Sequence, residues 1–193
     1  MNKTRLEAFS DGVLAIIITI MILEIKVPHG HKFVDLKPLF PKFLSYILSF
    51  IYVGIYWNNH HHLIHSLSKS NGKILWANLH FLFWLSLIPV ATGWMGEHNF
   101  EKAPMTLYGV VLLLCSIAYF ILERIIIIAE GRNSVLAKAI GYDLKGMIST
   151  ILYIFGIVLS FYNEWISGAA YLAVALLWLI PDKRIEKIIA AKD

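Results

Sequence analysis

Six long runs of apolar residues alternate with short polar stretches along the chain, and this pattern predicts six membrane-spanning helices. A helix needs ~20 predominantly apolar residues to cross a bilayer, and most of the runs reach that length. No polar stretch is long enough to separate two domains, so we expect one all-α transmembrane domain over residues 1–193. The predicted spans lie near residues 8–27, 40–63, 74–95, 104–128, 146–163 and 166–181.

The first predicted span has one smooth, branched-aliphatic face. At ~100° per residue, five small or apolar residues fall on one narrow stripe, with Thr19 at its edge and Asp11 pointing well away. The residues of this stripe are Gly12, Ile16, Ile20, Leu23 and Val27. Apolar stripes on spanning helices mostly face lipid or a neighbouring helix, so the pattern alone predicts a packing face.

Polar residues at the start of this span change that interpretation. Arg5 and Asp11 lie six residues apart, with Ser10 beside the carboxylate. Such groups are costly at the mouth of a span unless they have partners, so we predict a buried polar network there. Hydrogen-bonding side chains of the second and third spans are expected at the same depth, namely Trp57, Asn59, His60, His61, Trp76 and Asn78.

Composition and charge place the chain in the membrane class. Of its residues 58% are hydrophobic and 16% are charged, which excludes a soluble domain. The net charge of +4 comes from Lys and Arg scattered through short loops, so no nucleic-acid partner is expected. With a cytoplasmic amino terminus, twelve of these residues fall inside and five outside. The positive-inside rule therefore predicts a multi-pass cell-membrane protein with both termini in the cytoplasm.

A histidine cluster follows the second span, at positions 60, 61, 62 and 65. His61 and His65 are one helical turn apart and could share a metal ion, and His60 or His61 could hold a haem together with His80. No Cys, Asp or Glu lies close enough in sequence to complete a ligand set, and the single Cys115 sits inside an apolar run. We expect no metal, haem or other cofactor, and no enzymatic activity.

The residues Arg5, Phe9, Ser10 and Asp11 form an Arg-x-x-x-Phe-Ser-Asp motif directly before the apolar run. In this the chain resembles the potassium channels related to transmembrane protein 175, and Trp-x-Asn-His-His at 57–61 and Trp-x-Asn at 76–78 look like the same family. The resemblance implies a homotetramer in which the first helix of each copy lines the pore.

The resemblance also implies roles for individual residues of the first span. Ile16 would form the narrowest ring, Ile20 and Leu23 the further constrictions, and Thr19 a layer of hydroxyls. Ala15 stands where some members carry a Ser, so a second hydroxyl layer is not implied. The Arg5 to Asp11 network, on our hypothesis, sets the tilt of the helix and so the width of the constriction.

A potassium-selective channel with a hydrophobic filter is therefore the expected function. The sequence has no Thr-Val-Gly-Tyr-Gly loop, so selection of potassium over sodium would rest on partial dehydration, with dewetting of the rings as the gate. Proton permeation through the same pore remains an alternative. A secondary transporter is another, although the spans read as continuous and Asp11 and Glu24 lie toward opposite ends.

Overall fold

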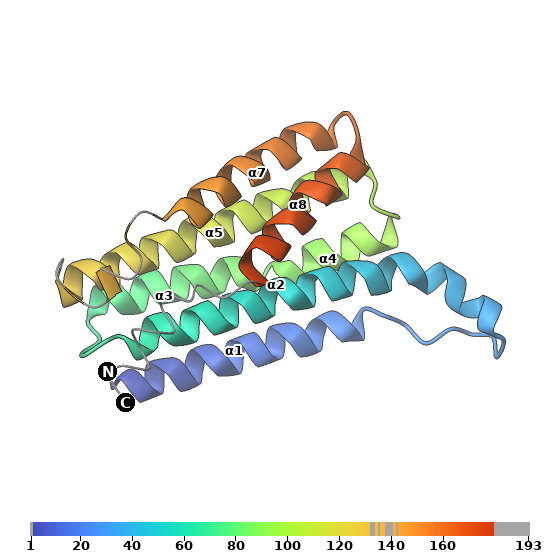
Figure 1. Cartoon of the computed structure of the whole chain (residues 1–193). Helices are drawn as coiled ribbons and strands as arrows, with labels where there is room; N and C mark the ends of the chain where they lie inside the picture. The colour runs from blue at the N-terminus through green and yellow to red at the C-terminus, as the bar shows by residue number, and fades with distance from the viewer. Residues whose placement is uncertain (1, 132–133, 135, 138–140, 142, 180–193) are drawn as a thin grey trace.

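A computed structural model describes residues 2–131, 134, 136–137, 141 and 143–179. Every regular element in this part of the chain is a helix (Figure 1), which confirms the predicted all-α fold. In chain order the elements are α1 (Lys3–Leu23), the 3-10 helix η1 (Phe33–Leu39), α2 (Phe40–His65), α3 (Gly72–Leu85), α4 (Ile88–Glu97), α5 (Lys102–Glu130), α7 (Leu144–Ser160) and α8 (Glu164–Leu179).

These helices correspond to the six predicted spans. Within the described residues, four segments are long and apolar enough to cross a membrane, namely 3–23, 33–65, 72–97 and 102–130, and α7 and α8 are shorter apolar helices. The predicted end of the sixth span, residue 181, lies outside the described residues. We call the end of the bundle where α1 and α3 begin and α2 and α5 stop the near end, and the opposite end the far end.

The first helix is shifted from its predicted position. It begins at Lys3, where the side chain of Asn2 accepts a hydrogen bond from the Thr4 backbone N–H (3.3 Å), and it ends at Leu23. Proline disfavours the helical conformation in the residue before it, so Pro28 prevents Val27 from continuing the helix. The prediction that Val27 extends the apolar stripe is therefore wrong.

The third span is not continuous, contrary to the prediction. A two-residue turn at Ser86 and Leu87 separates α3 from α4, and Pro89 lies in the first turn of α4. Proline has no N–H to donate to the carbonyl four residues earlier, and its ring clashes with that carbonyl, so the helix kinks here. The Leu87 N–H bonds instead to the Trp84 carbonyl (3.2 Å).

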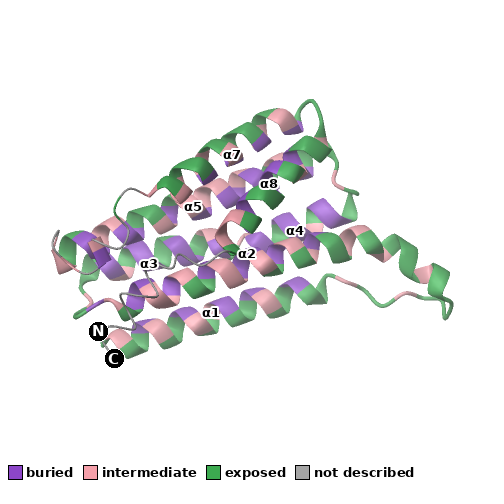
Figure 2. Ribbon diagram, viewed as in Figure 1, coloured by how far each residue is buried: buried purple, intermediate pink, exposed green. Residues whose placement is uncertain are grey.

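The helices pack into one connected core, with buried residues on the inward sides of the ribbons (Figure 2). α1 lies against α2, α3 and α4, while α5 packs on α3, α4 and α7, and α8 packs mainly on α7. The ring of Tyr171 on α8 fits between α5 and α7. A Cβ atom added at Gly109 or Gly156 would overlap this ring, so both positions need glycine.

Several polar groups inside the bundle are paired with one another. The Ser49 hydroxyl lies 2.6 Å from that of Thr92 and 3.0 Å from that of Tyr108. The Tyr52 hydroxyl donates to the Tyr171 carbonyl at 2.6 Å. Because hydrocarbon offers no hydrogen-bond partners, such pairs hold α2, α4, α5 and α8 in one arrangement.

Candidate functional site

Helix α1 has two different faces. One face packs against the bundle and carries the buried residues Leu6, Ser10, Leu14, Ile17 and Met21. The other face is exposed in the single chain, with Ile16 58%, Ile20 43% and Leu23 69% accessible. Figure 2 shows the buried positions of α1 on its side toward α2 and the exposed positions on its other side. The predicted stripe from residue 12 to residue 23 thus has no partner among the residues that the structure describes.

Thr19 lies on the exposed face between the levels of Ile16 and Ile20. Its hydroxyl donates to the Ile16 carbonyl at 2.9 Å, one turn back along the same helix. The only hydroxyl proton is used in that bond, so the oxygen presents lone pairs to its surroundings. This face is therefore aliphatic, with one acceptor oxygen per chain.

At the near end, three buried polar residues join α1 to α2 and α3. The Asn78 amide nitrogen donates to the Ser10 hydroxyl (3.0 Å), and Ser10 donates in turn to the Leu6 carbonyl (2.9 Å). The Asn78 oxygen lies 2.7 Å from Nε2 of His60. Because that oxygen can only accept, Nε2 of His60 carries the proton. All three side chains are fully buried.

Two charged residues of α1 face α2 beside this cluster. Asp11 accepts a hydrogen bond from Nε1 of Trp57 at 3.0 Å. Glu7 lies 2.8 Å from Nδ1 of His61. Sequence reasoning missed Glu7, although its spacing of four residues from Asp11 places both carboxylates on one side of the helix. Together with the buried cluster, these contacts fix the near end of α1 against α2 and α3.

Other predicted members of the network lie outside it. Arg5 is exposed, and no hydrogen bond or ion pair joins its side chain to the described residues. Phe9, four residues further along the helix, is 51% exposed. Both residues therefore lie on the outward face of α1. Trp76 is 76% exposed. The Asn59 amide donates to the Ile55 carbonyl of its own helix (2.8 Å). The expectation that Arg5 and Asp11 share one network is therefore not what the geometry shows.

The histidine cluster does not form a ligand set in the part of the chain that the structure describes, where no three His, Cys, Asp or Glu side chains are placed to hold a metal ion. The rings of His61 and His65 stack at 6.0 Å. His80, which the haem hypothesis would need, accepts from Nε1 of Trp84 at 2.9 Å.

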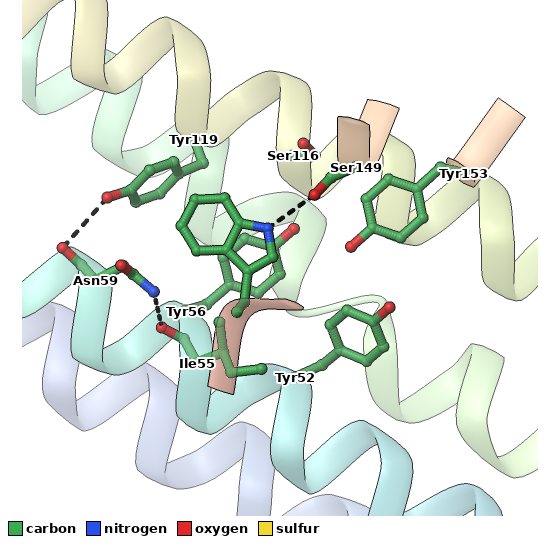
Figure 3. Close-up of a pocket in the computed structure, with 9 residues that line it drawn as sticks. Tyr52, Ile55, Tyr56, Asn59, Ser116, Tyr119, Ser149 and Tyr153 are labelled. Atoms are coloured by element: carbon green, nitrogen blue, oxygen red, sulfur yellow. Dashed lines mark hydrogen bonds between the residues drawn. The ribbon is translucent and has the colours of Figure 1, made fainter. Parts of the chain in front are cut away.

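A small cavity of about 30 Å³ lies between α2, α5, α7 and α8 (Figure 3). It is lined by Tyr52, Ile55, Tyr56, Asn59, Ser116, Tyr119, Ser149, Tyr153 and Trp178. This volume holds roughly two water molecules, and Trp178 closes one side by donating to the Ser149 hydroxyl (2.8 Å). No residue of α1 lines the cavity, so it is separate from the exposed face of that helix.

The fold and this site define a polytopic α-helical membrane protein whose first helix presents an unpartnered apolar face. The sequence profile of the family described as endosomal/lysosomal potassium channel TMEM175 matches residues 5–89, from α1 into α4. A protein named potassium channel from Chryseobacterium sp. (strain P1-3) is 60% identical over 187 residues, which cover 97% of both chains. The chain belongs to the TMEM175 family.

Two further comparisons set the range of this family. A crystal structure titled as a lysosomal potassium-selective channel TMEM175 homolog from Chamaesiphon minutus superposes with a TM-score of 0.80 at 27% identity, covering 93% of this chain and 97% of that one. A protein of Gallus gallus named endosomal/lysosomal proton channel TMEM175 is 34% identical over 103 residues, which are 47% of this chain and 21% of that protein. The Chryseobacterium relative thus matches 97% of this chain and the Chamaesiphon structure 93% of it.

Proposed function

We propose that this protein is a potassium-selective cation channel of the cell membrane, formed by four copies with α1 innermost. The observation that carries the proposal is the exposed face of α1, on which Ile16, Ile20 and Leu23 are left uncovered by the described part of the chain. Family membership supports the same function, since the Chryseobacterium and Chamaesiphon relatives are named potassium channels.

One helix cannot enclose a pore, so several copies must meet around a common axis. The number four follows from the resemblance to the family. In such an assembly Ile16, Ile20 and Leu23 become stacked rings, separated along the axis by ~6 Å and ~4.5 Å at 1.5 Å per residue. The near end faces the cytoplasm, because that orientation places most Lys and Arg residues inside.

The rings account for selectivity without a carbonyl filter. Aliphatic side chains supply no oxygen to replace the water around an ion, so an ion must shed part of its hydration shell to pass. Potassium holds water less tightly than sodium because it is larger, and it therefore passes more readily. The Thr19 hydroxyl donates its hydrogen bond to the Ile16 carbonyl, so the lone pairs of its oxygen can face a cation. Dewetting of the same rings closes the pore.

The contacts at the near end set the position of α1. Ser10, Asp11 and Glu7 bind side chains of α2 and α3, so they determine the tilt of α1 and through it the width of the rings. Arg5 and Phe9 lie on the outward face and would stand at the cytoplasmic entrance. At the kink in the third span, Ser86 and Leu87 both donate their N–H groups back to α3.

Flux of potassium, sodium and protons into liposomes that contain the purified protein tests this proposal. We expect potassium flux to exceed sodium flux, and Ile16→Asn to abolish that preference. Ile151→Asn on α7 is the matched control, because it places the same amide at a position of similar exposure, 64% against 58%. A folded parent protein that carries no passive cation flux would contradict the channel, and a proton flux without potassium flux would favour the proton alternative.

A further inference from the structure

The cavity between α2, α5, α7 and α8 carries polar groups that the proposed channel does not use (Figure 3). Its volume of about 30 Å³ exceeds the ~10–15 Å³ that one water molecule needs. Water occupies such a space where ~2–4 polar groups can bond to it, whereas a cavity with only apolar walls stays dry. The polar atoms of the lining residues therefore decide what the cavity holds.

The hydroxyl of Ser116, which lines the cavity from α5, makes no hydrogen bond to any residue that the structure describes. A serine inside a helix commonly donates to the carbonyl one turn earlier. Ser10 and Ser149 make this bond, to the carbonyls of Leu6 and Lys145. Ser116 thus keeps both its proton and its lone pairs for a partner in the cavity.

The α2 and α7 sides of the cavity supply further oxygen atoms. The Asn59 amide nitrogen donates to the Ile55 carbonyl, and the side-chain oxygen of Asn59 has no hydrogen-bond partner among the described residues. The Tyr153 hydroxyl interacts with those of Tyr52 and Tyr56, and Figure 3 shows the three close together. The proton of Tyr52 is donated to a carbonyl of α8. These three hydroxyls therefore offer more lone pairs than protons.

The cavity suits a small neutral molecule that can donate hydrogen bonds. None of the residues that line it is charged, so an ion would be buried there without a counter-charge, which is costly. Trp178 closes the α8 side by donating to the Ser149 hydroxyl at 2.8 Å, which limits the space. A water molecule fits this volume, donates two hydrogen bonds to the surrounding oxygens and accepts from Ser116.

We propose that the cavity is a water-binding site. About two ordered water molecules fill it, accept a hydrogen bond from Ser116 on α5 and donate to the oxygens of Asn59 on α2 and Tyr153 on α7. A bridging water is nearly as favourable as a direct hydrogen bond, so the site joins three helices through polar groups that do not bond directly to one another. Because no residue of α1 lines the cavity, this inference does not depend on the proposed channel.

A crystal structure of the full chain, determined with and without xenon under pressure and at a resolution that shows ordered water, tests the site directly. Xenon enters dry apolar cavities. We expect water density ~2.5–3.0 Å from Oγ of Ser116, the usual distance between two hydrogen-bonded oxygens, and no xenon in the cavity. Xenon bound in the cavity, or a cavity without water density, would overturn the proposal.

Thermal unfolding of two variants with the same shape gives a second test. Ser116→Thr keeps the hydroxyl and Ser116→Val removes it, so the bound water loses its donor only in the valine variant. The threonine variant should unfold at a temperature higher by ~2–4 °C, the effect of about one hydrogen bond in a chain of this length. In a dry cavity valine would be the more stable residue, because no unpaired hydroxyl would then be buried.

The matched controls are Ile117→Thr and Ile117→Val at the next residue of α5, which is 41% exposed on the outside of the helix. Valine should be the more stable residue there, so we expect the order of the two variants to reverse between positions 117 and 116. If valine is at least as stable as threonine at position 116 as well, the cavity holds no bonded water and the proposal fails.

Discussion

Asn78 on α3 donates a hydrogen bond to the hydroxyl of Ser10 on α1 across 3.0 Å, and both side chains are fully buried. The same amide accepts from His60 on α2, so one side chain connects three helices. Two buried groups on different helices therefore depend on Asn78, and its loss would leave both without that partner. This makes the amide the central contact at the near end.

Asn78→Ala should lower the free energy of unfolding by ~1–3 kcal/mol, because Ser10 and His60 each lose a buried hydrogen-bond partner. The measurement is thermal unfolding of the purified protein. Asn58→Ala is the control, since Asn58 is exposed on α2 and no hydrogen bond to its side chain is found among the described residues. Equal stability of the two variants would contradict the role assigned to Asn78.

The bond between Asp11 and Trp57 should be measurable as a coupling energy. Asp11→Ala and Trp57→Phe each remove it, so the double variant should be less destabilised than the sum of the singles by ~1.5–3 kcal/mol, the range for hydrogen bonds to charged groups. We further expect Asp11→Ala to lower the ratio of potassium to sodium flux, because α1 is then held less firmly. Additive stabilities would show that the two side chains do not interact in the membrane.

The sequence predicted the composition of this polar end better than its connections. Side chains of the second and third spans were expected near Ser10 and Asp11. Asn78 bonds to Ser10 and Trp57 to Asp11, while His60 joins the cluster through Asn78. Depth along a span follows from residue number, so the sequence could predict which side chains lie at the level of Ser10 and Asp11. Which donor meets which acceptor depends on helix rotation, and apolar periodicity fixes rotation only within tens of degrees.

The errors have equally local causes. Arg5 was expected in the Asp11 network, yet the two are six residues apart and so lie on different faces of a helix with 3.6 residues per turn. The kink in the third span follows from Pro89, and Pro28 keeps Val27 out of α1; both prolines were visible in the sequence. The contacts of Tyr171 with Gly109 and Gly156 join three helices that are distant in sequence, and no local pattern reveals them.

Gly156→Ala should destabilise the protein, whereas Gly54→Ala should not. A Cβ atom at Gly156 would lie 2.5 Å from Cε1 of Tyr171, which forces α7 and α8 apart at a cost of ~1–3 kcal/mol. A Cβ atom at Gly54 on α2 meets nothing within 4 Å, and alanine favours a helix by up to ~1 kcal/mol over glycine. Thermal unfolding of both variants should give shifts of opposite sign; a shared sign would contradict this packing.

Thr19 tests whether the exposed face of α1 meets permeating ions. The Thr19 hydroxyl donates its one hydrogen bond to the Ile16 carbonyl, so its oxygen can accept a hydrogen bond or coordinate a cation but cannot donate a second one. Thr19→Val keeps the shape of the side chain and removes this oxygen, and a loss of ~1 kcal/mol of cation stabilisation lowers potassium flux about fivefold. Thr19→Ser retains the oxygen and should keep most of the flux.

Thr150→Val on α7 is the matched control, because Thr150 makes the same kind of bond, to the Gly146 carbonyl at 2.9 Å, on a helix placed away from the pore. Equal flux for the two valine variants, measured in the same liposomes, would mean that Thr19 does not line the conduction path.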